Sequence, residues 1–425
     1  MKIFVSYLFS IFILSSCSKG EIFVVFNNQF IDSAPTSLSL TVSGAIENIE
    51  KVVTLNYSDI ENDQASNCSI TNLSHIIETS SCSCTGGVCT VGFTGTTNYF
   101  GEASFSYSVT ANDKTSKNTN ISFIIEPDNI ECPTGFIPVR RNATLGINDF
   151  CVMKYEARCV EGHPCDNAND APISQPTDTP WNNIRASESA GAGSGAQARC
   201  ESMSEVGFNS GTFTLISNPE WMTIARSIEK TNSNWSGGNV GNGSVPKGWV
   251  IGGFSTMDMA PAITAGENCL YTVTDTTFYA CANLNEAIDY HGSTEEAFKH
   301  KRAHKLYSTG EIWDFSGNIS EWVDWDPETS GFNQGPTDGD NLGLKELDNL
   351  VGSLTANDVS PLGPYNSVHL MGKYYPTLVG GSGYAFRGEN YMSGIGNSAG
   401  IYSLMLYGNS TTQSGTIGFR CVWRP

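Results

Sequence analysis

The sequence is poor in positive charge, in charged residues generally and in long apolar runs. Of its 425 residues, 23 are Lys or Arg against 43 Asp or Glu, and 16% are charged in all. The net charge of −20 argues against nucleic acid as a partner, because phosphate contacts need Lys and Arg. Long amphipathic periodicities are scarce, which argues against a helical bundle or coiled coil. Hydrophobic residues still reach 39% and glycines number 43, so we expect a globular protein rich in strands and loops.

The one long apolar run stands at the N-terminus and is too short to cross a bilayer as a helix. It covers residues 3–14 after Lys2, whereas a transmembrane helix needs about 20 apolar residues. A basic start, a short apolar core and small residues before a cleavage point are typical of a secretory signal peptide. We therefore expect an exported protein.

The residues Leu14-Ser-Ser-Cys17 resemble a bacterial lipobox. The resemblance implies a signal peptide over residues 1–17 and acylation of Cys17; the alternative is an ordinary signal peptide with a chance cysteine. Ser18 follows in place of Asp, which by the same resemblance favours a lipid-anchored protein of the bacterial outer membrane, facing the periplasm or the cell surface. Residues 18–33 are then a tether from this anchor in the membrane.

Twelve cysteines remain when Cys17 is set aside. An even number in an exported chain predicts disulfides. A zinc site is less well supported, because Cys82-Ser-Cys84 lacks the paired two-residue spacing of zinc ribbons. Four cysteines stand early and eight stand late, which suits two separately bridged domains. The groups are Cys68, Cys82, Cys84 and Cys89, and then Cys132, Cys151, Cys159, Cys165, Cys200, Cys269, Cys281 and Cys421.

Residues 34–127 form the first predicted domain, in which apolar and polar residues alternate along four short runs. The runs are 37–42, 52–57, 105–109 and 121–125. Alternation of this length with turn residues between the runs predicts an antiparallel β-sandwich. Residues 98–109 resemble the last hairpin of bacterial cadherin-like, Ig-like tandem repeats, and Ala34-Pro35 resembles the point where such a repeat begins.

An acidic loop in this domain carries Asp59, Glu61 and Asp63 at every second position, and resembles the acidic loop of the same repeats. This spacing can turn several carboxylates toward one hard cation such as Ca²⁺. The alternative is a solvated acidic turn without an ion. Both interpretations stay open at this point.

Residues 131–425 form the second predicted domain, in which we expect two helices. One covers residues 187–207 and carries Cys200. The other begins with Asn218 as its N-cap and Pro219 in the first helical position.

Four sequence blocks of this domain occur in a characteristic order. They are Phe150-Cys-Val-Met-Lys-Tyr-Glu-Ala157, Asn218-Pro-Glu-Trp-Met222, Ile312-Trp-Asp-Phe-Ser-Gly-Asn-Ile-Ser-Glu-Trp322 and Ile417-Gly-Phe-Arg-Cys421. Together they resemble the sulfatase-modifying-factor family, whose namesake is the formylglycine-generating enzyme. The resemblance implies an α+β, C-type-lectin-like fold and a long-range disulfide between Cys200 and Cys421.

The family's enzyme oxidises a substrate cysteine with two copper-binding thiols that lie five residues apart. The matching stretch here is 387–398, and Ser393 and Ser398 occupy the two thiol positions. A hydroxyl is a hard, poor ligand for Cu(I), which prefers thiolates. We therefore expect neither bound copper nor catalytic residues. The alternatives are a formylglycine-generating-type oxidase or a non-haem iron enzyme.

Two histidines are the strongest argument for the iron alternative. His300 and His304 have the i, i+4 spacing with which a helix can hold a metal ion. The surrounding residues are basic, and nearby cations repel a metal ion. A solvated helix face is therefore the better interpretation of the two.

A structural Ca²⁺ site is implied at residues 317–321. The family binds Ca²⁺ there through backbone carbonyls and a carboxylate, which here places Gly317, Ile319 and Glu321 as ligands. Hard oxygen ligands suit this ion. The alternative is a packed core in which Glu321 accepts hydrogen bonds from the backbone.

The last forty residues combine tyrosines with small polar residues, which is the composition of an antibody-like binding surface. Residues 387–420 also resemble the variable segment of proteins that are diversified by retroelements and share the lectin-like fold. The alternative is a Gly/Asn-rich loop with aromatic residues in the core. The candidate ligand-binding residues are Glu389, Tyr391, Ser393, Tyr402 and Tyr407.

The sequence thus predicts a lipid-anchored, exported binding protein. Its cadherin-like domain would be a spacer, and its lectin-like domain would present a surface to an unknown protein or glycan. The alternatives are the oxidase or iron enzyme, a retroelement-diversified receptor, and a structural protein of the envelope.

Overall fold

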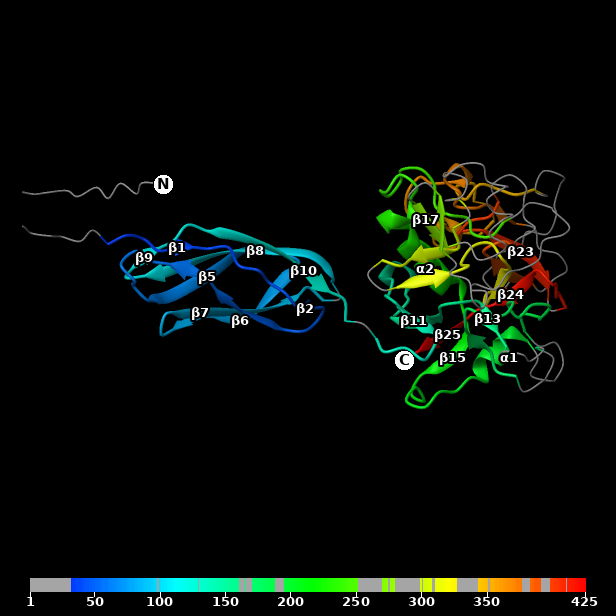
Figure 1. Cartoon of the computed structure of the whole chain (residues 1–425), viewed down its shortest axis with the longest axis horizontal. Coiled ribbons are helices and arrows are strands. Elements are labelled where there is room, and N and C mark those ends of the chain that lie inside the picture. Colours follow the sequence, from blue (N-terminus) through cyan, green and yellow to red (C-terminus); the bar gives the residue numbers. More distant parts are fainter. Residues whose placement is uncertain are drawn as a thin grey trace, which may run out of the picture. The chain divides into compact units, whose positions relative to one another are not determined.

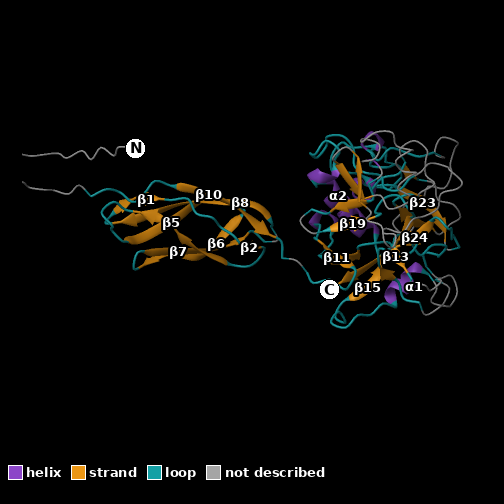
Figure 2. Cartoon of the chain, in the orientation of Figure 1, coloured by secondary structure: helices purple, strands orange, loops and turns teal. Residues whose placement is uncertain are grey.

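The structure is a computed structural model, and it describes residues 32–425 except 98, 129, 160–164, 166–169, 188–194, 251–269, 274–275, 280–298, 300, 308–309, 327–342, 351, 377–382, 391–397 and 410. The protein is mainly β, with several sheets and few helices (Figure 2). The chain divides into two compact units, Met1–Asp128 and Asn129–Pro425. In the part of the chain that is described, no helix is both long and apolar enough to cross a lipid bilayer. Cys17 lies outside the described residues.

The first unit contains two main sheets that share one hydrophobic core (Figure 1). One sheet has the strand order β2-β10-β8-β5 with β9 beside β8, the other has the order β3-β7-β6, and β1 pairs with β4. The strands are β1 (Thr36–Ser37), β2 (Ala45–Ile46), β3 (Lys51–Leu55), β4 (Tyr57–Ser58), β5 (Ala65–Ser74), β6 (Ile76–Thr85), β7 (Val88–Gly95), β8 (Gly101–Ala111), β9 (Lys114–Thr115) and β10 (Thr119–Glu126).

Alternation along β8 and β10 builds this core. Phe105, Tyr107 and Val109 are fully buried, and Phe123 packs against Phe105 with ring centroids 6.1 Å apart. Three of the four predicted runs lie mainly in strands, which confirms the β-rich prediction for this unit. The strand expected over 37–42 ends at Ser37 instead. Beyond it the backbone N–H of Leu38 still donates to the carbonyl of Asn56 at 2.9 Å, and the carbonyl of Leu38 accepts from the Tyr107 hydroxyl.

Two disulfides staple the first unit. Cys68–Cys82 joins β5 to β6, and Cys84–Cys89 crosses the β6–β7 hairpin between directly paired residues. All four early cysteines are thus bridged among themselves, which confirms the prediction of disulfides in this unit.

The second unit is built around two larger sheets with small hairpins beside them. Their strand orders are β11-β12-β25-β15 and β21-β23-β22-β20-β24, while β13-β14, β16-β17 and β18-β19 pair separately. The strands are β11 (Phe136–Val139), β12 (Phe150–Met153), β13 (Ala157–Arg158), β14 (Ile173–Ser174), β15 (Thr212–Leu215), β16 (Leu270–Val273), β17 (Thr276–Tyr279), β18 (Ala303–Lys305), β19 (Glu311–Trp313), β20 (Ser320–Val323), β21 (Tyr374–Tyr375), β22 (Gly383–Arg387), β23 (Leu404–Asn409), β24 (Ile417–Phe419) and β25 (Cys421–Arg424).

The helices of the second unit are short. They are α1 (Ala196–Glu201), α2 (Asn218–Glu229) and α5 (Ala356–Val359), with 3₁₀ turns at Ala143–Leu145, Asn232–Asn234 and Ser367–His369. Of the helix expected over 187–207, the structure shows only Ala196–Glu201: Ser187 and Gly195 are not helical, and the chain leaves the helix after Glu201.

Helix α2 begins one residue earlier than predicted. Ser217, not Asn218, is the N-cap: its hydroxyl accepts from the backbone N–H of Glu220, and the Glu220 carboxylate accepts from the backbone N–H of Ser217. This reciprocal pair satisfies two donors that a helix start leaves open. Asn218 is consequently free to turn its side chain inward.

Candidate functional site

The acidic loop of the first unit is organised by one aspartate. Asp59 Oδ1 accepts hydrogen bonds from the backbone N–H groups of Glu61 and Asp63, each at 3.0 Å. Asp and Asn side chains commonly stabilise turns in this way. The Oδ2 atom of Asp59 is buried and has no hydrogen-bond partner among the described residues.

A fourth acid, Asp32, joins this loop from the segment before the predicted domain. Its carboxylate lies 3.3 Å from Lys114 Nζ and accepts from Asn112 Nδ2 at 3.0 Å. Burial and the nearby charges of Asp59 and Asp32 raise the pKa of Asp63 above its ordinary value. Crowded carboxylates of this kind repel one another, and a bound cation would relieve the repulsion.

In the second unit, three of the four sequence blocks meet in one buried network, and the second block forms a buried pair of its own. Arg420 of the last block donates to both carboxylate oxygens of Glu321 in the third, at 3.0 and 2.8 Å. Arg420 also donates to the backbone carbonyl of Met153 in the first block, at 2.8 Å. Asn218 of the second block accepts from Arg387 Nε at 2.7 Å. The residues that carry the family resemblance therefore form a scaffold.

A second carboxylate, Glu156, ties this scaffold to the loop before β20. Its oxygens accept from Asn318 Nδ2 at 2.5 Å and from the backbone N–H of Ile319 at 3.3 Å. Glu156 is fully buried, and burial, with the charges of Asp314 and Glu321 beside it, raises its pKa well above the ordinary value. The guanidinium of Arg158 is 3.8 Å away, too far for a hydrogen bond.

The predicted Ca²⁺ ligands Gly317, Ile319 and Glu321 do not fit this geometry. Both oxygens of Glu321 are held by the Arg420 guanidinium, a permanent cation that would repel Ca²⁺ at the same carboxylate. Gly317 has a φ of 78°, and a Cβ there would stand 2.6 Å from Trp249 N. Glycine is thus needed for close packing of two backbones. Trp313 and Trp322 are buried beside this pair, and Glu321 accepts from a side-chain cation in place of the expected backbone donors.

The expectation for the histidines also changes. His304 lies on strand β18, not on a helix, and it is fully buried instead of solvated. Its Nε2 donates to the backbone carbonyl of Pro246 at 2.9 Å, and burial lowers its pKa to about 4. The Nδ1 atom is buried without a hydrogen-bond partner in the described part of the chain. His300 lies outside the described residues.

The candidate ligand-binding residues near the C-terminus divide into buried and undescribed ones. Tyr402 lies in the core, where its hydroxyl donates to the Glu229 carboxylate, so it is not part of a binding surface. Glu389 is also buried, at 6% exposure. Tyr391 and Ser393 lie outside the described residues, as does the side chain of Tyr407. Ser398 is buried, and the Ser403 hydroxyl donates to its backbone carbonyl at 2.5 Å.

Three disulfides brace the second unit: Cys132–Cys151, Cys159–Cys165 and Cys200–Cys421. The last is the pair that the family resemblance implies, and it ties α1 to the first residue of β25. Every cysteine that the structure describes is bonded in one of the five disulfides, while Cys269 and Cys281 lie outside the described residues. Five disulfides indicate an extracytoplasmic protein.

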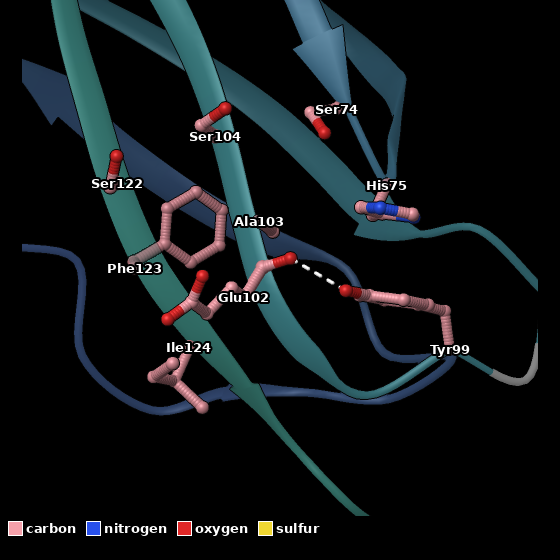
Figure 3. A pocket seen from close by; sticks show the side chains of 9 residues that line it. All are labelled: Ser74, His75, Tyr99, Glu102, Ala103, Ser104, Ser122, Phe123 and Ile124. Atoms are coloured by element: carbon pink, nitrogen blue, oxygen red, sulfur yellow. Dashed lines mark hydrogen bonds between the residues drawn. The ribbon is translucent and has the colours of Figure 1, made fainter. Parts of the chain in front are cut away.

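A polar hollow, which we call the Tyr99 groove, lies on the first unit (Figure 3). It has a volume of about 530 Å³. The rings of His75 and Tyr99 stand on one side of β8, and β10 lies on the other. The lining residues are Ser74, His75, Tyr99, Glu102, Ala103, Ser104, Ser122, Phe123 and Ile124.

The sequence-based reasoning missed the Tyr99 groove and Asp32. A signal for the groove is present in the sequence: Glu102, Ser104 and Ser122 occupy the polar positions of two alternating strands, so they share the outer face of the sheet. No comparable signal existed for His75, which is brought to Tyr99 by a turn between strands that the sequence did not predict.

Comparison with known proteins adds little. No protein-family model matches the chain, and no curated protein matches it either. Among solved structures, a partial match is found with the endo-fucoidan hydrolase MfFcnA4 from glycoside hydrolase family 107, at 16% sequence identity and a TM-score of 0.19. It covers 26% of this chain and 16% of the hydrolase, so the chain spans about a sixth of that protein.

Proposed function

We propose that the chain is a lipid-anchored, exported binding protein of the bacterial outer membrane. In this proposal Cys17 carries the lipid, and a cadherin-like, Ig-like sandwich spaces the second unit from the membrane. The second unit has the C-type-lectin-like fold of the sulfatase-modifying-factor family and presents a surface to a protein or glycan. It binds its ligand without catalysis.

The observation that carries this proposal is the buried network of the second unit. Glu321 and Arg420 are both fully buried and paired through two hydrogen bonds, and they come from two different family blocks. Side chains whose polar atoms are buried and bonded in such pairs stabilise the fold, and these atoms are not accessible to a substrate. The family resemblance is then a likeness of scaffold, and function belongs to the loops that the scaffold carries.

The positions and the bonding of the cysteines support the proposal that the second unit has no oxidase centre. A copper-dependent oxidase of this family needs two thiols, and the two positions hold Ser393 and Ser398. Cys421, the cysteine nearest to them in sequence, is bonded to Cys200. Its sulfur is therefore not a thiolate that could bind Cu(I).

A copper and peptide assay tests this proposal. Purified protein with added copper, in air, should not convert the cysteine of a Cys-Thr-Pro-Ser-Arg peptide to formylglycine above the copper-only control, as read by mass spectrometry. The matched variant, Ser393→Cys with Ser398→Cys, should bind Cu(I) but give little turnover, because the proposal predicts no substrate groove. Turnover by the unmodified protein would overturn the binding-protein proposal.

We also propose that the acidic loop of the first unit binds Ca²⁺. The residues fit a hard cation, because one buried oxygen of Asp59 has no hydrogen-bond partner among the described residues and the pKa of Asp63 is raised. Asp59, Glu61 and Asp63 would hold the ion, and its charge would offset the repulsion among them and the neighbouring Asp32, whose own carboxylate is paired with Lys114.

A further inference from the structure

We propose that the Tyr99 groove of the first unit binds an uncharged saccharide. The proposed function assigns only Ca²⁺ to this unit, at the acidic loop, so the inference about the groove stands apart from it. The groove volume of about 530 Å³ falls within the ~300–1,000 Å³ that is typical of small-molecule sites.

The groove exists because strand β5 bends away from its neighbour. Its register against β8 shifts between Thr71 and Ser74, and such bulges bend a strand. The turn that follows places His75 at a φ of 59°, a left-handed conformation that is rare for residues other than glycine. The His75 ring then lies on the same side of β8 as Tyr99 (Figure 3).

The aromatic wall is rigid before any ligand arrives. The rings of His75 and Tyr99 stack with centroids 4.1 Å apart and an interplanar angle of 3°. The Tyr99 hydroxyl donates to the backbone carbonyl of Glu102 at 2.6 Å, and the backbone N–H of Thr96 donates to the carbonyl of His75 at 2.9 Å. A preformed wall spares a ligand the entropy cost of ordering it.

The floor of the groove offers two hydroxyl groups and one carboxylate as hydrogen-bonding groups. Ser104 and Ser122 are directly paired across β8 and β10, and Glu102 is paired with Ile124 one step along the same face. The Glu102 side chain is exposed. Hydroxyl groups of a ligand can therefore donate to the carboxylate and exchange hydrogen bonds with the two serines.

The charge of the lining selects among ligand classes. Among the described residues that line the groove, none is Lys or Arg, and Glu102 supplies a negative charge. Sulfate, phosphate and carboxylate groups are thereby repelled. A quaternary ammonium ion is also a poor fit, because the two rings stack on each other and cannot surround a cation as an aromatic cage does. A neutral ligand with many hydroxyls and an apolar face remains.

The sheet beyond the groove has the same character. Ser69 and Ser108 exchange a hydrogen bond at 3.1 Å, Asn72 donates to Ser106 at 3.3 Å, and Ser106 donates to Asn120 at 3.4 Å. This row of hydroxyl and amide groups continues from Ser104 along β8 without a charged side chain up to Thr110. Ser106 and Ser108 are themselves buried, so Ser69, Asn72 and Asn120 are the members of this row that a ligand could reach.

The test uses purified full-length protein and four probes, with binding measured by calorimetry. The probes are linear hexasaccharides of glucose, mannose and N-acetylglucosamine, and a sulfated heparin hexasaccharide. At least one uncharged probe should bind, and heparin should not. Failure of every uncharged probe at millimolar concentration, or binding of heparin alone, would overturn the inference.

Two variants locate the site. Glu102→Gln should weaken binding at least tenfold, because hydrogen bonds to a charged acceptor are stronger than those to a neutral one. His75→Gly removes a wall ring while suiting the left-handed backbone, so it should weaken binding to a similar degree and keep the fold. Asp113→Asn, at the far end of β8, is the matched control and should bind normally. Unchanged binding by both groove variants, with melting curves showing that they are folded, would refute the site.

Discussion

The buried His304 makes the stability of the second unit depend on pH in a predictable way. The Nε2 atom donates to the Pro246 carbonyl, which can only accept, so Nε2 carries the proton of the neutral ring. A second proton must then go to Nδ1. That atom is buried and has no hydrogen-bond partner among the described residues. The charged ring therefore has no compensation in the folded state.

The size of the effect follows from the shift in pKa. Burial lowers the pKa of His304 from 6.5 to about 4, so between these values the unfolded chain binds more protons than the folded one. The contribution of His304 to stability is complete above pH 6.5 and is lost as the pH falls toward 4. One unit of pKa corresponds to 1.36 kcal/mol, so the loss is about 3 kcal/mol.

The assay is guanidinium unfolding at a series of pH values between 7 and 4, for the wild type and for His304→Gln. Glutamine can still donate to the Pro246 carbonyl but does not titrate. All eight tryptophans lie between residues 181 and 423, so their fluorescence reports on the second unit alone. Taking the difference between the two proteins removes the titration of all other groups.

The unfolding free energy of the wild type should fall by about 3 kcal/mol more than that of His304→Gln when the pH is lowered from 7 to 4. The variant is expected to be less stable at pH 7, and the gap should close on acidification. A gap that stays constant within about 1 kcal/mol would refute the reasoning.

Two further predictions concern carboxylates. Glu321→Gln leaves the fully buried Arg420 without its counter-charge, so the second unit should lose about 3–5 kcal/mol of unfolding free energy in the same fluorescence assay; a loss below about 1 kcal/mol would contradict the buried pair. Asp59→Asn keeps an oxygen that can accept from the turn but removes a charge, so it should abolish the rise in melting temperature that Ca²⁺ gives the first unit. Calorimetry measures this, with the tryptophan-detected transition as the internal control, and an equal Ca²⁺ effect in the variant would argue against this ion site.

The sequence predicted those parts of the fold in which side-chain pattern and burial agree. Strands β8 and β10 alternate between apolar and polar residues, except at the exposed Ile124, and the structure buries the inward-facing apolar set. Strands β5 and β6 escaped prediction because most of their residues are Ser, Thr or Asn and are exposed on the outer faces. They are held by pairing to β7 and β8 and by the Cys68–Cys82 disulfide, which no local pattern reveals.

The candidate sites were harder to predict because their residues meet from distant parts of the chain. Glu321 was expected to be an ion ligand because the family resemblance implies it; its actual partner, Arg420, is 99 residues away. Tyr402 looked like a surface residue among small polar neighbours. Its hydroxyl instead donates a hydrogen bond to Glu229, which is 173 residues away. In the same way, Asp32 reaches the acidic loop from a segment that we expected to be a tether.

The position of strand β25 sets the order in which the second unit can be completed. This strand lies between β12 and β15, and it carries the cysteine that closes a disulfide over 221 residues. Both neighbouring strands precede it in the chain, so their sheet has an open slot until β25 has emerged. A chain that is still being synthesised or exported therefore cannot close this sheet early. Cys132–Cys151 and Cys159–Cys165 can form before that point, whereas Cys200 must wait for Cys421.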